Sequence, residues 1–386
     1  MKKIFYLFIS LSLIFSSTAI ISHAEQKSIN VYNWAEYISD GEDDTMDVNA
    51  EFEKRTGIKV NYTNYATNED LYAKLKSGGA NYDVIIPSDY MLERLKVEGM
   101  LQKINFKNVP NYKYITEEYK NMFYDPTNEY SVPYTVGMVG LIYNKKYVSG
   151  TPDSWSLMWD GAYTDKILMF ESPRDAFAIA QNLLGIDLNT EDPKEWQKVA
   201  DKLKEQRNVL QSYVSDEIFN KLESGEAYIG AYYAGDYLSM VEKNPDLGFV
   251  YPKEGTNFFV DAMCIPKNAE HKDYAEMYIN FMLEPDVAKA NAEYICYATP
   301  NTAVMEMDDY EYKDNEIIYP NARVRKNTQY FHNLSPETLQ LMSDLWEEVK
   351  IDNSENKGLY IRFAVVGVIA LAVIIYRLIK KKIRAI

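Results

Sequence analysis

The chain has 386 residues, of which 47% are hydrophobic and 25% charged, an ordinary globular composition with enough length for two lobes that each have a core. Its formal net charge is −16, and basic residues gather at the two ends. Positions 1–24 and 359–386 hold eight basic residues and no acidic one, which leaves 33 basic and 57 acidic residues between them. A body this acidic excludes charge-driven binding to nucleic acid or an anionic membrane surface, and it favours either a cationic partner or solubility alone.

The first 24 residues predict a signal peptide. Lys2-Lys3 forms a basic n-region, residues 4–15 form an apolar h-region, and Ser22-His23-Ala24 is a small-x-small cleavage site, so the mature chain is expected to begin at Glu25. An uncleaved anchor is the alternative. Lipid attachment at this point is excluded, because no cysteine lies near the cleavage site.

The C-terminal residues predict a transmembrane helix at 359–379. Residues 363–376 form a run without charge, and the flanking Arg362 and Arg377 have side chains long enough to reach the membrane surface. A basic tail follows at 380–386, and positive residues stay on the cytoplasmic side of a membrane. We therefore expect the body to lie at the extracytoplasmic face of the cell membrane, anchored by this helix. A buried core helix is the alternative.

Strand and helix patterns alternate from the start of the body. This order predicts an α/β domain with a parallel sheet, in which ligands bind beyond the carboxyl ends of the strands. Loops 33–37 and 87–90 occupy such positions and combine aromatic residues with a hydroxyl or an acid. The expected strands lie near 29–32, 58–62 and 83–86, and the expected helices at 44–56, 68–77 and 89–98.

A second α/β block is predicted from residue 139. The expected organisation is two lobes with a cleft between them and several crossings of the chain, lobe 1 comprising 25–138 and 260–303 and lobe 2 comprising 139–259 and 304–352. Cys264 and Cys296 are the only cysteines, and either a disulfide or two buried thiols is compatible with an oxidising compartment. The further elements are expected at 139–143, 167–170, 174–184, 193–206, 228–232, 258–265, 271–283, 285–293 and 336–350.

Three acidic residues follow strands of the second block or its return, and each has aromatic neighbours. They are Asp175, Asp236 and Asp261. A carboxylate gives a cationic amine a charge-assisted hydrogen bond worth about 1.5–3 kcal/mol, and an aromatic face adds about 0.5–2 kcal/mol. The pattern suits a flexible alkyl chain with a charge at each end. The alternative is that Asp175 and Asp236 cap helices, a common use of aspartate after a strand.

Seven short runs give the body, about 28–335, a resemblance to the spermidine/putrescine-binding proteins of bacterial polyamine ABC importers. The runs follow the order and nearly the spacing of that family. They are Tyr32-Asn33-Trp34-Ala35-Glu36-Tyr37, Tyr72-Ala73-Lys74-Leu75-Lys76, Tyr82-Asp83-Val84-Ile85-Ile86-Pro87-Ser88, Glu98-Gly99-Met100, Tyr251-Pro252-Lys253-Glu254-Gly255, Pro285-Asp286-Val287-Ala288-Lys289 and Tyr297-Ala298-Thr299-Pro300-Asn301.

The resemblance implies an α/β, two-lobed periplasmic-binding-protein-like clamp of the type II solute-binding fold. Such a clamp closes on a polyamine, spermidine or putrescine, with aromatic walls above and below it and acids at its amines. The expected partners are the permease subunits of an ABC importer, and no cofactor, nucleic acid or enzymatic step is expected. The protein is expected to be a monomer that makes and breaks no bond.

The resemblance also implies the site residues by position. Asp175 matches an acid that holds a terminal amine, and Asp261 matches the acid at an inner nitrogen. Trp34 and Tyr37 match the wall of the first lobe, and Tyr297 a further wall. The full expected set is Trp34, Tyr37, Ser88, Tyr90, Asp175, Tyr233, Asp236, Phe259, Asp261 and Tyr297.

Three positions depart from the spermidine type of this family. Tyr233 and Phe259 stand where it has tryptophan, and Ser172 stands where it has a second aspartate close to the one matched by Asp175. The putrescine-preferring branch also lacks that aspartate and carries an aromatic-Ala-Gly-Asp run like the one ending at Asp236. The resemblance therefore implies an amine-binding role for Asp236 and leaves the choice between spermidine and putrescine open.

Three alternatives have other chemistry. A secreted hydrolase would need paired carboxylates, since His271 and His332 lie in polar contexts without a metal-ligand spacing or nucleophile motif. A clamp for ferric iron could use the adjacent Tyr232-Tyr233, although neighbours in a strand point to opposite faces. A sensor or interaction role for a tethered receptor is the third alternative.

Overall fold

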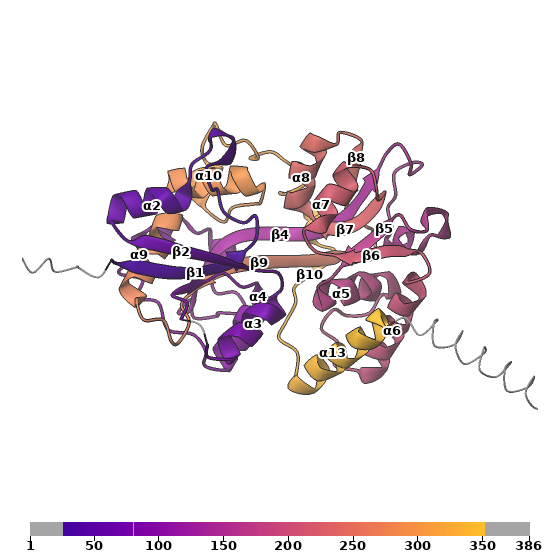
Figure 1. Cartoon of the computed structure of the whole chain (residues 1–386), viewed down its shortest axis with the longest axis horizontal. Coiled ribbons are helices and arrows are strands. Elements are labelled where there is room, and N and C mark those ends of the chain that lie inside the picture. Colours follow the sequence, from indigo (N-terminus) through magenta and orange to yellow (C-terminus); the bar gives the residue numbers. More distant parts are fainter. Residues whose placement is uncertain (1–25, 80, 352–386) are drawn as a thin grey trace, which may run out of the picture.

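The computed structural model of the protein describes residues 26–79 and 81–351. These residues form two α/β lobes, which lie side by side along the longest axis (Figure 1). One mixed sheet runs through both lobes with the strand order β2-β1-β3-β9-β4-β7-β5-β6, while β10 pairs with β9 and β8 with β4. The lobes are therefore joined through the sheet itself as well as by connecting chain.

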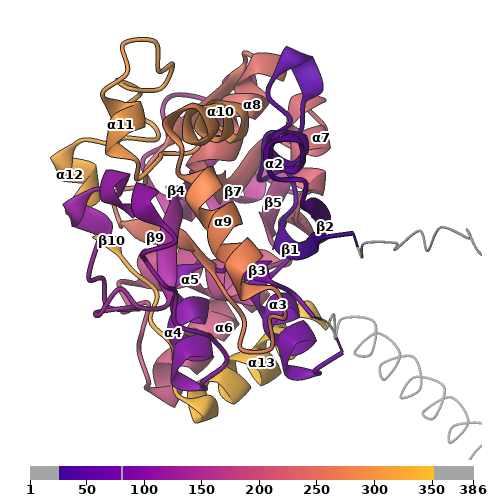
Figure 2. The ribbon, with the colours of Figure 1, turned by 90° about the vertical axis from the view of Figure 1, so that its left-hand side faces the viewer.

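The first lobe is built around parallel strands β1, β2 and β3. Figure 2 shows α2 and α10 on one side of these strands and α3 and α4 on the other. Its strands are β1 (Ser28–Trp34), β2 (Lys59–Tyr65) and β3 (Val84–Ile85), and its helices are α2 (Val48–Thr56), α3 (Asn68–Lys76), α4 (Asp89–Val97), α9 (Lys272–Met282), α10 (Pro285–Ile295) and α11 (Thr302–Met305). Short 3-10 turns lie at Glu42–Asp44, Pro110–Tyr114 and Glu117–Tyr119.

The second lobe is built around β5, β6 and β7, which are parallel to one another. Its strands are β5 (Ile167–Phe170), β6 (Leu210–Val214), β7 (Ile229–Tyr233) and β8 (Leu247–Val250), and its helices are α5 (Pro173–Leu184), α6 (Pro193–Gln206), α7 (Glu217–Glu223), α8 (Ala234–Lys243) and α13 (Pro336–Lys350). Short 3-10 turns lie at Trp155–Trp159 and Gly161–Tyr163, and α12 (Ala322–Arg325) precedes β10 (Thr328–Gln329).

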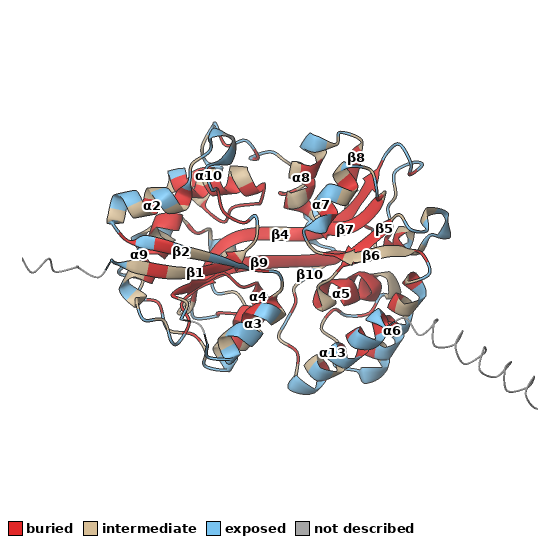
Figure 3. Ribbon diagram, in the orientation of Figure 1, coloured by how far each residue is buried: buried red, intermediate tan, exposed pale blue. Residues whose placement is uncertain are grey.

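Two long strands cross between the lobes. β4 (Ser131–Asn144) pairs antiparallel with β9 (Thr256–Cys264) through residues 131–138, and with β7 and β8 through residues 139–144. Every residue of β9 is buried, as is every residue of β4 except Gly137 (Figure 3). A pair of strands shared by two lobes permits a hinge while the buried side chains keep the pair intact.

Local sequence explains where many helices begin and end. The Asp47 carboxylate accepts a hydrogen bond from the Ala50 amide at the start of α2, and Gly57 ends that helix with a positive φ of 70°. Proline occupies the first turn of α5, α6, α10 and α13, where its missing N–H costs nothing. β4 begins earlier than the strand predicted near 139–143. It includes Pro133, which lies at a register shift where its missing N–H is tolerated.

The predicted fold class is corrected on one point. Its two-lobed α/β part agrees with the observed architecture, whereas the described structure adds no transmembrane helix to it: no helix within 26–79 and 81–351 is long and apolar enough to cross a membrane. The predicted span at 359–379, like the signal peptide at 1–24 and the basic tail at 380–386, lies outside the described residues. Cys264 and Cys296 are both buried and unpaired.

Candidate functional site

A cleft between the lobes is lined by the loops that follow six strands of the sheet. Its empty space is about 950 Å³, counting the part open to solvent. The loops after β1, β2 and β3 line it from the first lobe, and those after β5, β6 and β7 line it from the second, which is the carboxyl edge expected for ligand binding. β9 passes through it with Asn257, Phe259 and Asp261.

Asp261 of β9 lines the cleft and is 3% exposed. The Tyr37 hydroxyl donates a hydrogen bond of 2.6 Å to its Oδ2, while its Oδ1 has no hydrogen-bond partner within the described residues. Burial raises the pKa of Asp261 to about 6, although the hydroxyls of Ser88 and Tyr37 act in the opposite direction. A buried carboxylate oxygen without a partner is costly, so this atom marks where a cationic donor fits.

Asp175 lies at one end of the cleft, in the first turn of α5. The Tyr233 hydroxyl donates to its Oδ2 at 3.3 Å. Burial raises the pKa of Asp175 to about 6 against the opposing effect of the Ser172 and Tyr233 hydroxyls. The N-cap of α5 is Ser172 and not Asp175, so the Asp175 carboxylate is available to the cleft.

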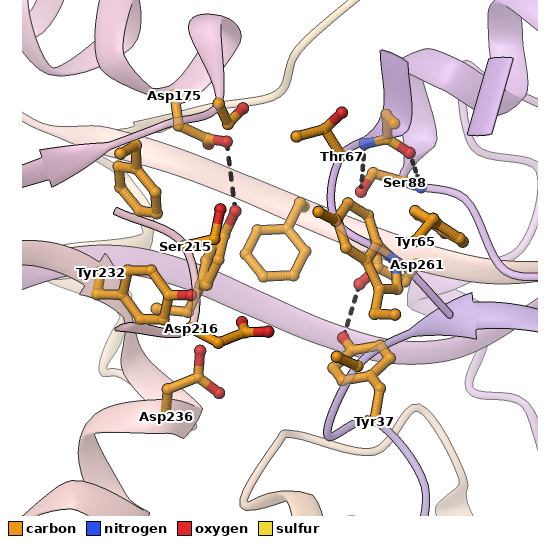
Figure 4. Close-up of a pocket in the computed structure, with 18 of the residues that line it drawn as sticks. Tyr37, Tyr65, Thr67, Ser88, Asp175, Ser215, Asp216, Tyr232, Asp236 and Asp261 are labelled. Atoms are coloured by element: carbon orange, nitrogen blue, oxygen red, sulfur yellow. Dashed lines mark hydrogen bonds between the residues drawn. The ribbon is translucent and has the colours of Figure 1, made fainter. Parts of the chain in front are cut away.

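Asp236 lies at the other end, in the first turn of α8. Figure 4 shows Asp175 and Asp236 on opposite sides of Tyr232 and Ser215. Burial raises the pKa of Asp236 to about 8, partly offset by a hydrogen bond from Tyr297, and nearby Asp216 raises it further. Because Tyr233 is the N-cap of α8, Asp236 is not a capping residue either.

The aromatic walls of the cleft come from both lobes. In the first lobe the Trp34 ring lies 4.6 Å from the Tyr65 ring, and both side chains donate hydrogen bonds to the Ile86 carbonyl, at 3.0 and 2.6 Å. In the second, Tyr233 lies edge-on to Phe259, with ring centres 5.5 Å apart. These hydrogen bonds and edge contacts hold the rings in place around the acids.

Two glycines allow rings to lie against the backbone at this site. A Cβ added to Gly137 of β4 would lie 2.3 Å from the Phe259 ring, and one added to Gly235 of α8 would lie 2.3 Å from the Tyr297 ring. No real Cβ contact is that short, so both ring positions depend on glycine. Gly235 thus brings Tyr297 against the turn that carries Asp236.

The structure brings the residues expected from sequence into one place. Every one of them lines the cleft except Tyr297, which packs behind it with its ring 5.1 Å from that of Tyr37. Tyr232 lines the cleft together with Tyr233 although strand neighbours point to opposite faces, because β7 ends at Tyr233 and the chain turns directly into α8. The expected residues that line it are Trp34, Tyr37, Ser88, Tyr90, Asp175, Tyr233, Asp236, Phe259 and Asp261.

Sequence reasoning missed two acids at the Asp236 end. Asp216 follows β6 and Glu36 follows β1, so they come from opposite lobes, and both are exposed at the edge of the cleft. The pKa of Glu36 is raised, first by burial and then by Asp216. The rule that ligands gather at strand ends could have found Asp216, but β6 was absent from the predicted elements.

The chemistry of the site is that of cation recognition. The described part of the chain holds no group of three or more His, Cys, Asp or Glu side chains arranged to bind a metal ion. Three carboxylates that line one cleft together with aromatic faces instead suit an elongated organic cation.

Comparisons with known proteins place the chain in a family. The family model for bacterial extracellular solute-binding proteins matches residues 48–319, which is more than half of the chain. This protein therefore belongs to the bacterial extracellular solute-binding proteins, a class that fits both the two-lobed fold and the cleft.

Individual relatives are similar over most of their length. The spermidine/putrescine-binding periplasmic protein of Salmonella typhimurium is 36% identical over 306 residues, covering 78% of this chain and 86% of the relative. The putrescine-binding periplasmic protein PotF of Escherichia coli is 30% identical over 347 residues, covering 85% and 92%. The structure of the spermidine/putrescine ABC transporter substrate-binding protein PotD from Streptococcus pneumoniae has a TM-score of 0.70 at 33% identity, covering 84% of this chain and 98% of that one.

Proposed function

We propose that this chain is the extracytoplasmic polyamine-binding subunit of an ABC importer and takes spermidine or putrescine into the cleft between its lobes. The observation that carries the proposal is Asp261, whose buried Oδ1 lacks a hydrogen-bond partner among the described residues in a cleft that Asp175 and Asp236 also line. The names of the relatives, which include spermidine and putrescine binding, support the same ligand class.

The site residues have distinct proposed roles. Asp175 holds one terminal ammonium group, and Asp236 holds the other with Glu36 and Asp216 near it. Asp261 receives an inner nitrogen or a nearer terminal amine. Trp34, Tyr37, Ser88, Tyr90, Tyr233 and Phe259 surround the methylene chain, and Tyr297 supports Asp236 from behind.

The energetic requirement is within reach of such a site. A micromolar dissociation constant corresponds to about 8 kcal/mol, and charge-assisted hydrogen bonds contribute about 1.5–3 kcal/mol each before the cost of ordering the ligand. To shift the equilibrium between the open and closed clamp from 1:99 to 99:1, the ligand must bind the closed form more favourably by about 5.5 kcal/mol. Contacts from both lobes are therefore required, and the proposed residues provide them.

The mechanism we propose involves binding alone, without a chemical step. The ligand bridges the lobes, the hinge through β4 and β9 closes, and the permease subunits recognise the closed monomer. Membership of a solute-binding family favours this mechanism over the carboxylate-dependent hydrolase, and the names of the relatives favour a polyamine over ferric iron.

The test is calorimetric titration of the protein with spermidine, putrescine, cadaverine and spermine, alongside a thermal-shift panel with the same compounds. We expect at least one of them to bind with a micromolar or lower dissociation constant. 1,4-Butanediol, which has the length of putrescine without its charges, is the matched negative control. Absence of binding by all four amines would overturn the proposal.

A further inference from the structure

Arg174 is a buried cation that the proposed binding mechanism does not use. It is 2% exposed, and its Nη2 donates to Asn189 Oδ1 at 2.9 Å and to the His332 carbonyl at 3.3 Å. Its Nε and Nη1 have no hydrogen-bond partner among the described residues. Burial lowers the pKa of Arg174 to about 10. A buried guanidinium with two unused donors is costly and calls for an acceptor.

Glu69 of α3, in the opposite lobe, is an acid with a carboxylate oxygen that lacks a hydrogen-bond partner within the described part of the chain. Its Oε1 accepts a hydrogen bond of 3.1 Å from the Tyr90 hydroxyl, but its Oε2 is buried without a partner. Burial raises the pKa of Glu69, and Arg174 acts in the opposite direction. Neither Glu69 nor Arg174 lines the cleft.

Tyr90 lies between the two charges. Its hydroxyl reaches Glu69, and the Arg174 guanidinium lies 5.9 Å from the centre of its ring. α3, α4 and α5 lie on the same side of the paired strands β4 and β9 (Figure 1). No ion pair joins Glu69 and Arg174 in the described structure, although one aromatic residue contacts both.

The lobes already touch beside this pair. Phe331, which precedes α13, packs edge-on against Tyr90 with ring centres 5.8 Å apart, and the Arg174 guanidinium lies 4.6 Å from the Phe331 ring centre. Next to it, the Asn333 amide donates to Glu93 Oε2 of α4 at 2.8 Å. Glu69 and Arg174 thus lie beside an interface where the lobes are already in contact.

We propose that Glu69 and Arg174 form an ion pair across the lobe interface when the clamp closes on its ligand, and that they act as positioning residues for Tyr90 and Asp175. The pair supplies each charge with the partner it lacks. It also fixes α5, whose first turn carries Asp175, against the α3–α4 side of the first lobe. Part of the free energy of closure then comes from outside the ligand contacts.

This inference rests on the proposed function, because its readout is polyamine affinity. The experiment is a double-mutant cycle with Glu69→Gln, Arg174→Gln and the double variant, measured by titration with spermidine and with putrescine. We expect Glu69→Gln to weaken binding about tenfold in the wild-type background, since removing one partner leaves the other charge buried and unpaired. In the Arg174→Gln background the same change should weaken polyamine binding by less than about twofold.

A second measurement needs no Arg174 variant. Because the pair forms only on closure, Glu69→Gln should not lower the melting temperature of the ligand-free protein, and it should reduce the shift that spermidine produces. A merely structural glutamate would lower both melting temperatures together. Glu306→Gln, which removes an exposed charge far from the interface, is the control and should change neither value.

The outcomes separate the two proposals. If the wild-type protein binds no polyamine, the proposed function fails. If the wild-type protein binds a polyamine, but Glu69→Gln leaves the affinity unchanged or weakens it equally in both backgrounds, the ion pair is overturned while the polyamine site stands. Equal losses in both backgrounds would indicate that Glu69 acts on the ligand independently of Arg174.

Discussion

The hydroxyl of Tyr37 donates a hydrogen bond of 2.6 Å to Asp261, joining the loop after β1 to the strand that crosses between the lobes. The same hydroxyl lies 2.5 Å from Thr135 Oγ1 on the neighbouring strand β4. Tyr37 is buried, so this network is shielded from solvent. It leaves one oxygen of Asp261 occupied and the other without a hydrogen-bond partner among the described residues.

Replacing Asp261 by asparagine is expected to weaken polyamine binding at least tenfold without unfolding the protein. The change keeps the size of the side chain but removes the charge that strengthens a hydrogen bond to an ammonium group, worth about 1.5–3 kcal/mol. Titration calorimetry measures the affinity, and circular dichroism checks the fold. An unchanged affinity would remove Asp261 from the site.

Tyr37→Phe should weaken binding more at pH 6 than at pH 8. The Tyr37 hydroxyl lowers the pKa of Asp261 against the larger effect of burial, so its loss raises that pKa further and protonates the carboxylate over a wider range. At pH 8 the carboxylate is restored and most of the loss should disappear. A pH-independent loss would show that the hydroxyl acts by packing or by contact with the ligand instead.

The ligand-free protein should lose stability as the pH rises from about 4 to 8. Folded-state pKa values are raised to about 6 for Asp175 and Asp261 and to about 8 for Asp236, against about 3.9 for an unfolded aspartate. The folded chain therefore holds protons that the unfolded chain has released, and this stability is lost as pH rises through the folded values. Melting temperatures across this range measure the effect, and Asp236→Asn should flatten the upper part of the curve.

Polyamine affinity should change in the opposite direction, rising between pH 5 and 8 as the same carboxyls ionise. Bound ammonium groups favour the charged carboxylates, so binding releases protons. Calorimetry in two buffers of different ionisation enthalpy counts them at pH 7. Binding without proton release would contradict the raised pKa values of the empty cleft.

Gly235→Ala is expected to destabilise the protein by about 1–3 kcal/mol and to weaken binding. The new methyl group would lie 2.3 Å from the Tyr297 ring and force it away from the turn that carries Asp236. Gly161→Ala is the matched control, because nothing lies within 4 Å of an added Cβ there. Equal stability and affinity for the two variants would show that Tyr297 has no supporting role.

Much of the secondary structure followed from local pattern. The expected helices at 68–77, 89–98 and 193–206 differ from α3, α4 and α6 by a residue or less at each end, because capping residues and apolar spacing mark them clearly. β6, β8, α7 and α8 were absent from the prediction. β6 has no buried residue before Val214, so its sequence lacks the alternation or apolar run of a core strand.

The sequence by itself determined the α/β alternation, the acidity of the body and, through its motif runs, the family and the residue types of a cation-binding site. These depend on neighbours in the chain, where period and capping are visible. Only the tertiary structure decided that Asp216 lies near Asp236, that Tyr297 stands behind the cleft rather than in it, and that Glu69 and Arg174 of opposite lobes both contact Tyr90. Such relationships arise where strands distant in sequence end at one edge of a sheet, and burial there sets the pKa of each acid.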